Sequence, residues 1–341
     1  MKRQDIKEEQ IMRSKQEFYE EIKENIREYL PPEYEDAEIS LTTQVKNMDV
    51  EMTGLLIRLP GESAAPVIYL DSMYEQYKDG RPMEGILMEV ADTRRGASLA
   101  SLSIDPDTVT RYSEVRDKLQ IRLLDTRANR RRLDNLVHHS YGDLTACYCV
   151  VLKETPENSM GCMVTPSMMK CWGITKRQLH EDAIEADTLR GVFLFDMSSV
   201  EAMILEGAEP VNMLGEGAVA PEPDQPPKLM CLTSGSRMYG AGLIVDPRIQ
   251  EQIAGVCGGS YFILPSSVHE VLIMKDDGGR AEEAPALEGL VQEINATTVD
   301  PSDRLSDHVQ YYDAGSKQIV NAMAFERENR EIAPPARSMR I

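Results

Sequence analysis

The chain has 341 residues, of which 42% are hydrophobic and 28% charged. This composition suits about two globular domains of ~150 residues and excludes disorder of the whole chain. The formal net charge is −20, so the surface repels phosphate backbones and nucleic-acid binding is not expected. The charged N-terminus lacks the apolar run of a signal peptide, and no segment approaches the ~20 apolar residues of a membrane span.

The N-terminal region predicts a helix followed by strands. Phe18, Ile22 and Ile26 recur at helical spacing, which predicts a long amphipathic helix over residues 6–30 that Pro31 ends. Strands are expected over 38–46, 51–59 and 66–70, and helices over 71–77 and 83–93.

The middle of the chain is mixed α and β. Strands are predicted over 118–125 and 144–152, and the second is a near-continuous apolar run typical of a buried strand. Thr175 and Gln178 form a capping pattern that begins a helix reaching Leu189. A similar pattern predicts a short helix over 200–206. Residues 209–228 contain five prolines and read as a linker or long loop, so the main domain boundary is placed there.

The C-terminal region reads as strand, strand, helix, twice, followed by a hairpin. The first hairpin is predicted over 228–233 and 238–245. Asp246 caps the next helix, Pro247 takes its first position and Gly258 ends it. Strands over 260–264 and 268–275, a helix around Leu287 and a hairpin over 308–313 and 317–321 follow.

These elements predict an α+β fold in two parts, with mostly antiparallel sheets and helices packed on one face. The expected organisation is an N-terminal α+β domain over 1–208, the linker over 209–228, a C-terminal ββα-ββα-ββ domain over 229–325 and a polar tail over 326–341.

Six stretches of the sequence share a pattern with one known family. They are Tyr239-Gly-Ala-Gly-Leu-Ile-Val245, Tyr261-Phe-Ile-Leu-Pro-Ser-Ser-Val-His-Glu270, Asn295-Ala-Thr-Thr-Val299, Leu305-Ser-Asp-His-Val309, Ile174-Thr-Lys-Arg-Gln-Leu-His-Glu-Asp-Ala183 and Asp71-Ser-Met-Tyr-Glu-Gln-Tyr77. The chain resembles, over most of its length, a bacterial family described only as a domain of unknown function and encountered mainly in anaerobic gut bacteria. Ala186-Asp187-Thr188 departs from the pattern of that family. The resemblance implies a cytosolic two-part fold and carries no catalytic residue.

The first candidate site comprises His269, Glu270, Asp307 and His308. Two imidazoles and two carboxylates can ligate a divalent metal or share a proton. Against this reading, Ser267 to Glu270 is also a capping pattern, and Asp307 can bond backbone N–H groups in a turn. Adjacent side chains on a strand point to opposite faces, so at most one of each pair faces a shared site.

The second candidate is a patch of arginines, Arg127, Arg130, Arg131 and Arg132, within a stretch of local net charge +5 between Arg94 and Arg132. Arginine forks suit phosphates and carboxylates, so the patch can bind phosphate or an acidic partner. The alternative is that these arginines pair with acidic groups elsewhere in the fold.

Cysteines and glycines offer weaker signals. Cys147 and Cys149 share a strand face, which suits redox or metal chemistry, but buried small hydrophobes are the commoner case. Gly240 and Gly242 lack the third glycine of a dinucleotide site and indicate close backbone approach. The six cysteines form no Cys-x-x-Cys pair, which indicates reduced thiols and a cytoplasmic location.

The sequence contains no phosphate-binding loop, no His-Glu-x-x-His, no Gly-x-Ser-x-Gly and no EF-hand motif, and no cofactor is predicted. The favoured interpretation is a non-enzymatic interaction or regulatory protein that binds a protein partner. Two alternatives stay open: a metal-dependent hydrolase or nuclease that uses the His269, Glu270, Asp307 and His308 cluster, and an acidic mimic of nucleic acid that competes for a basic partner.

Overall fold

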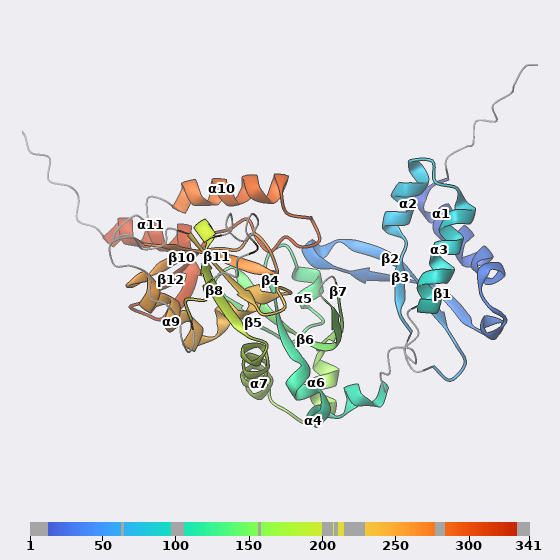
Figure 1. Ribbon diagram of the computed structural model, residues 1–341, viewed down its shortest axis with the longest axis horizontal. Coiled ribbons are helices and arrows are strands. Elements are labelled where there is room, and N and C mark those ends of the chain that lie inside the picture. Colours follow the sequence, from blue (N-terminus) through green and yellow to red (C-terminus); the bar gives the residue numbers. More distant parts are fainter. Residues whose placement is uncertain are drawn as a thin grey trace, which may run out of the picture. The chain divides into compact units, whose positions relative to one another are not determined.

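The structure, a computed structural model, describes residues 13–62, 65–96, 106–155, 158–199, 207, 211–214, 229–276 and 284–332 (Figure 1). Contacts divide the chain into two compact units, the first over Met1–Lys46 and Val50–Asp107 and the second over Asn47–Asp49 and Thr108–Ile341. The fold is α+β with antiparallel sheets, as the sequence predicts. Among the described residues, no helix combines the length and the apolar character that a bilayer span requires.

The first unit is built on a three-stranded antiparallel sheet, ordered β1-β2-β3. Its elements are α1 (Lys15–Asn25), β1 (Glu38–Val45), β2 (Glu51–Arg58), β3 (Val67–Tyr69), α2 (Asp71–Lys78) and α3 (Met83–Gly96). Leu55 and Ile57 alternate along β2 and pack with Phe18 of α1 and Ile86 of α3 in one buried cluster. The helices of this unit therefore cover one face of its sheet.

The N-terminal helix is shorter than predicted. Ser14 is extended, and its hydroxyl accepts a hydrogen bond from the Glu17 N–H while the Glu17 carboxylate accepts one from the Ser14 N–H. This capping box starts α1 at Lys15, so a continuous helix over 6–30 is wrong. Residues 6–12 of the prediction lie outside the described residues. The C-terminal end tightens into a 3₁₀ turn over Ile26–Tyr29 before the prolines.

The second unit contains two sheets. A six-stranded sheet has the order β13-β12-β10-β11-β9-β8, and a four-stranded sheet has the order β4-β6-β5 with β7 also paired to β6. The strands are β4 (Leu119–Asp125), β5 (His138–Tyr141), β6 (Leu144–Thr155), β7 (Asn158–Met163), β8 (Val192–Asp196), β9 (Leu229–Ser234), β10 (Tyr261–Leu264), β11 (Glu270–Lys275), β12 (Gln310–Asp313) and β13 (Gln318–Asn321). The α-helices are α4 (Tyr112–Val115), α5 (Arg130–Leu133), α6 (Pro166–Trp172), α7 (Lys176–Leu189), α9 (Pro247–Cys257), α10 (Ala284–Thr297) and α11 (Ala322–Ile332).

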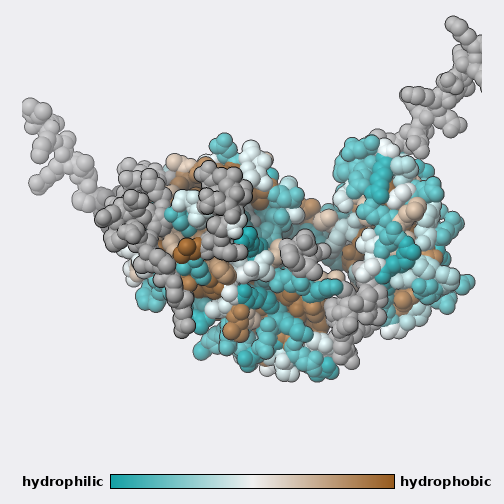
Figure 2. All heavy atoms as spheres, in the orientation of Figure 1, coloured by the Kyte–Doolittle hydropathy of each residue, from teal (hydrophilic) through white to brown (hydrophobic). Residues whose placement is uncertain are grey.

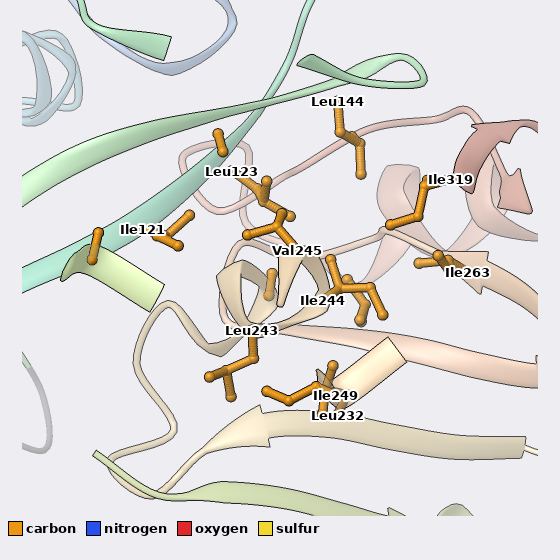
Figure 3. Close-up of a cluster of buried hydrophobic side chains, with 14 of the residues drawn as sticks. Ile121, Leu123, Leu144, Leu232, Leu243, Ile244, Val245, Ile249, Ile263 and Ile319 are labelled. Atoms are coloured by element: carbon orange, nitrogen blue, oxygen red, sulfur yellow. The ribbon is translucent and has the colours of Figure 1, made fainter. Parts of the chain in front are cut away.

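The main core of the second unit lies between these two sheets (Figure 3). Ile121 of β4, Leu232 of β9 and Ile263 of β10 belong to one buried cluster. The 3₁₀ segment η7 (Gly240–Val245) contributes six consecutive buried residues to the middle of it. Both sheets and η7 therefore bury their apolar groups together.

The segment over 238–245 was expected to be a strand, and this expectation is wrong because residues 240–245 form η7. Strand β9 already pairs with β8 on one side and β11 on the other, so it has no free edge for a hairpin partner. The absence of a side chain at Gly242 lets η7 approach β4, since a Cβ there would lie 2.7 Å from the Ile121 carbonyl oxygen. The glycines allow close backbone approach, although in a different element from the one predicted.

Helix caps form as the sequence predicts. The Thr175 hydroxyl accepts a hydrogen bond from the Gln178 N–H at the start of α7. The Asp246 carboxylate accepts one from the Arg248 N–H at the start of α9, and Gly258 ends that helix with φ 75°. These local signals are correct because the cap and its partners are only two or three residues apart.

Both faces of the six-stranded sheet are buried at β10, one against η7 and the four-stranded sheet and the other against α10. Tyr261 and Ile263 of β10 face the main core, while Phe262 and Leu264 face a second cluster that includes Leu287 of α10. Strand β10 is apolar on both faces, which a sheet exposed on one side would not require.

The predicted domain boundary differs from the division in the structure. Strand β8 precedes the segment over 209–228 and β9 follows it, yet the two strands pair in one sheet. Most of that segment and the predicted helix over 200–206 lie outside the described residues. The predicted tail over 326–341 is also not entirely irregular, because α11 continues to Ile332.

The visible surface is mostly hydrophilic, with small hydrophobic patches between polar areas (Figure 2). The large hydrophobic residues that are exposed include Leu189, at 78%, and Val211, at 59%. Isolated exposed apolar side chains are ordinary on protein surfaces, so they do not by themselves indicate a docking site.

Replacing Gly242 by Ala tests whether η7 depends on close approach to β4. We expect Gly242→Ala to lower the free energy of unfolding by about 1–3 kcal/mol, because the new methyl group meets backbone that cannot move aside. Gly255→Ala is the control, since its Cβ meets nothing within 4 Å and a helical alanine should be neutral or stabilising by about 0.5–1 kcal/mol. Urea denaturation measures both, and an unchanged midpoint for Gly242→Ala would contradict the packing argument.

Candidate functional site

A buried arginine lies on β4, on the face of the four-stranded sheet that points away from the main core. Residues alternate along a strand, so Ile121 and Leu123 enter the main core while Gln120 and Arg122 point to the other side. Arg122 is 7% exposed and lies opposite Cys147 of β6. Full burial of a guanidinium is rare without paired partners, so its contacts decide what this site can do.

The Arg122 guanidinium contacts uncharged groups. It stacks on the Tyr239 ring, 3.0 Å from the ring centroid, and its Nη2 donates to the Ser159 hydroxyl at 3.1 Å. The Cys149 thiol lies 3.9 Å from the same nitrogen. The buried Nε has no hydrogen-bond partner, and neither has the buried Oε1 of neighbouring Gln120. The side chain is thus held by neutral contacts and keeps one donor unused.

Tyr239 is fixed in place by its backbone. Its φ is 55°, in the left-handed region that residues other than glycine rarely adopt. The Tyr239 N–H donates to Nδ1 of His269 at 3.2 Å, and the two rings lie 5.0 Å apart. Since Nδ1 accepts, the neutral His269 carries its proton on Nε2, which faces the Asp303 carboxylate at 3.6 Å.

A second arginine, Arg132 of α5, lies close enough to Arg122 for their charges to interact. Burial lowers the pKa of the Arg132 guanidinium, and the charge of Arg122 contributes to the lowering. Within the described part of the chain, no carboxylate oxygen lies within 4.0 Å of either guanidinium. We call Arg122, Arg132, Tyr239, Cys149 and Ser159 the arginine cluster.

The predicted His269, Glu270, Asp307 and His308 site is divided between different partners. His269 faces Asp303, and burial raises the pKa of Glu270. His308 lies instead 3.4 Å from Glu288 of α10. The Asp307 carboxylate accepts from the Asn295 amide at 2.7 Å. Across the described residues, no three His, Cys, Asp or Glu side chains come together in a way that could hold a metal ion.

The predicted arginine patch also separates into different environments. Asp49 accepts hydrogen bonds from the backbone N–H groups of Arg131 and Arg132, which fixes the start of α5. Arg127 and Arg130 are exposed, whereas Arg132 is partly buried and belongs to the arginine cluster.

The thiols are poor nucleophiles in these surroundings. Burial raises the pKa of Cys147 to about 12 and also raises the pKa of Cys149, although the nearby arginines oppose both shifts. All six cysteines are free. A neutral thiol reacts far more slowly than a thiolate, so Cys147 and Cys149 suit packing better than redox chemistry.

Sequence reasoning missed a chain of four side chains between the four-stranded sheet and α7. The Tyr148 hydroxyl lies 2.5 Å from Nδ1 of His139 and 2.9 Å from Nδ1 of His180. Nε2 of His180 lies 2.8 Å from the Tyr141 hydroxyl, and the two imidazoles stack with ring centroids 4.5 Å apart. We call these four residues the histidine–tyrosine chain.

The histidine–tyrosine chain can carry a proton between its ends. Each hydroxyl and each neutral imidazole donates one hydrogen bond and accepts another, so the bonds run in one direction from His139 to Tyr141 or in reverse. Burial lowers the pKa of His139 to about 4, with His180 as a further cause, and burial also lowers the pKa of His180. Both rings are therefore neutral near pH 7.

The charge of Asp187 on α7 is buried beside the arginine cluster. Its carboxylate accepts the Ile121 N–H of β4 at 2.7 Å and lies 3.8 Å from Nε of Arg190. Burial raises the pKa of Asp187 to about 7, against the influence of that hydrogen bond and of Arg190 and Arg122. Asp187 thus closes the edge of β4 at an electrostatic cost.

A cleft of about 370 Å³ lies between α7, β8 and the start of α9. Its charged residues pair with each other, because the Arg248 guanidinium donates to both oxygens of the Asp246 carboxylate at 3.1 and 2.8 Å. This cleft therefore presents satisfied polar groups, unlike the arginine cluster.

Comparison with known proteins gives a family and no activity. The model of a family described as "Family of unknown function (DUF5688)" matches residues 15–314. No curated protein and no solved structure matches the chain. The matched range contains the whole arginine cluster and the whole histidine–tyrosine chain.

Asp187 predicts that stability falls as the pH rises through neutrality. Its folded pKa, about 7, exceeds the ordinary value of 3.8, so its contribution is fully present below pH 3.8 and is lost as the pH rises through 7. The difference in free energy of unfolding between Asp187→Asn and the wild type should therefore shift in favour of the variant by on the order of 2 kcal/mol from pH 5 to pH 8. Urea denaturation at both pH values measures this difference. The same difference at pH 5 and pH 8 would contradict a raised pKa for Asp187.

His139 predicts a pH dependence of the opposite sign. Its folded pKa, about 4, lies below the ordinary 6.5, so its contribution is complete above pH 6.5 and is lost as the pH falls toward 4. Relative to His139→Gln, the wild type should therefore lose melting temperature between pH 7 and pH 5. His138→Gln is the control, because its ring bonds only the Leu136 carbonyl. Parallel curves for the wild type and His139→Gln would refute the prediction.

Proposed function

The chain belongs to this family of unknown function, and we propose that it acts as a non-enzymatic interaction or regulatory protein. The observation that carries the proposal is that the side chains best suited to catalysis are engaged in contacts that hold the fold. A catalytic acid or base must be within reach of a substrate and able to change its protonation state near the working pH.

The imidazoles support this reading. Both nitrogens of His180 contact tyrosine hydroxyls. His269 accepts a hydrogen bond from the backbone N–H of Tyr239, and its other ring nitrogen faces Asp303. These contacts position the backbone of Tyr239 at the start of η7. His308 faces Glu288, and this contact links the start of β12 to α10. Each ring therefore has a structural role that a reaction would disturb.

The arginine cluster supports binding. The fully buried Arg94 is paired with a carboxylate, because its guanidinium lies 2.7 Å from Glu62. Arg122 and Arg132 have no such partner among the described residues. Two guanidiniums without a carboxylate oxygen within 4.0 Å are suited to an anionic group of a ligand or of a partner protein.

The metal-dependent hydrolase or nuclease is the alternative that a direct assay separates most readily. It requires His269, Glu270, Asp307 and His308 to share an ion, although their contacts lie with different partners. The acidic mimic of nucleic acid rests on the net charge of −20 alone. A bacterial origin and a cytoplasmic location are part of the proposal, and the free thiols of the chain favour the latter.

A hydrolase and nuclease panel tests the proposal. We expect the purified protein to show no turnover of phosphate-ester, carboxylic-ester or nucleic-acid substrates with Mg²⁺, Mn²⁺ or Zn²⁺, and elemental analysis to find no stoichiometric metal. The control is His138→Ala beside His269→Ala and His308→Ala. Turnover that both His269→Ala and His308→Ala remove, and that His138→Ala retains, would replace the proposal with the metal-dependent enzyme.

A further inference from the structure

We propose that the arginine cluster is a binding site for a phosphate monoester, the dianionic group of a small phosphorylated molecule. This inference rests on the proposed function and deepens it, because it names the chemical class of a regulatory ligand. An unused buried donor, a pair of positive charges and a buried position support this site.

The unused donor is Nε of Arg122. The side chain is 7% exposed, and this nitrogen has no partner although Nη2 bonds Ser159. A buried charged group that lacks a partner costs free energy relative to water, so such donors are usually satisfied. A phosphate oxygen accepts strongly from a guanidinium and would supply the missing partner.

The two charges match a dianion. The charges of Arg122 and Arg132 interact, and no carboxylate oxygen of the described residues lies within 4.0 Å of either guanidinium. Asp187 is close to Arg122 but is committed to the Ile121 N–H and to Arg190. A phosphate monoester carries about −1.5 to −2 charges at pH 7, whereas a carboxylate or a phosphodiester carries about −1.

Neighbouring groups fix where the phosphate would lie. The Ser159 hydroxyl is a further donor beside Arg122. The Oε1 of Gln120, which has no hydrogen-bond partner, is an acceptor that repels an anion. The phosphate is therefore expected between Nε of Arg122 and the Arg132 guanidinium, away from Gln120.

The recessed position argues against nucleic acid as the ligand. Nε of Arg122 is buried and its guanidinium stacks on the Tyr239 ring, so a ligand reaches this nitrogen only when side chains around it move, and a terminal phosphate requires less movement than a continuous backbone. The net charge of −20 also repels a polyanion more strongly than a single phosphate, because a polyanion brings more negative charges to the acidic surface.

Isothermal titration calorimetry with defined anions tests the site. The probes are inorganic phosphate, methyl phosphate, dimethyl phosphate and acetate at pH 7.5 and equal ionic strength. We expect phosphate and methyl phosphate to bind, and dimethyl phosphate and acetate to bind at least about tenfold more weakly because they carry one charge. Arg132→Gln should weaken methyl phosphate at least about tenfold.

Arg130→Gln is the matched control, because Arg130 is an exposed arginine of the same helix and the charge change is the same. It should bind methyl phosphate as the wild type does. Arg122→Lys keeps the buried charge but loses the forked donors of the guanidinium, so it should also weaken methyl phosphate binding. This variant tests the site if Arg132→Gln does not fold.

Several results would overturn the inference. They are no heat of binding for methyl phosphate, equal affinity for dimethyl phosphate, or an equal loss in Arg130→Gln and Arg132→Gln, which would assign binding to the exposed arginines. Failure of the proposed function looks different, because the hydrolase and nuclease panel would then show turnover that His269→Ala and His308→Ala remove, while methyl phosphate still binds at the arginine cluster. If the hydrolase and nuclease panel shows no turnover and methyl phosphate does not bind, the phosphate site is refuted and the proposed function is not.

Discussion

The second unit depends on the burial of η7 between its two sheets. Six consecutive residues of this segment are buried, and its glycines lie close to the backbone of neighbouring segments. A segment without side chains at two positions can approach β4, β9 and the end of β11 at once, which joins both sheets into one hydrophobic cluster. Loss of that approach would separate apolar surfaces that neither sheet can cover alone.

The same packing creates the arginine cluster. Tyr239 directly precedes η7, and its left-handed backbone conformation costs on the order of 1–3 kcal/mol for a residue other than glycine. The close packing of Gly240 and the hydrogen bond from Tyr239 to His269 keep it there. The Tyr239 ring consequently covers Arg122, so the geometry of the cluster follows from how the core is closed.

Local features were predictable from the sequence and long-range ones were not. The caps at Thr175 and Asp246 depend on neighbours two or three residues away, and both form. The fate of residues 240–245 depends on whether β9 has a free edge, which is decided by β8 and β11 far away in the sequence. The prolines over 209–228 suggested a domain boundary, but the pairing of β8 with β9 places the strands on either side of that segment in one unit.

The candidate residues also show the difference between local and long-range information. Arg132 and His269 stood out by local charge or motif, yet only tertiary packing shows that one is part of the arginine cluster while the other orients Tyr239. The histidine–tyrosine chain joins β5, β6 and α7, and no spacing rule links His180 to Tyr141. Burial also affects their chemistry, because it lowers the pKa of His139 and His180 and raises the pKa of Cys147 and Cys149. Because arginine cannot relieve its burial by losing a proton near neutral pH, it is the group whose environment most requires an external anion.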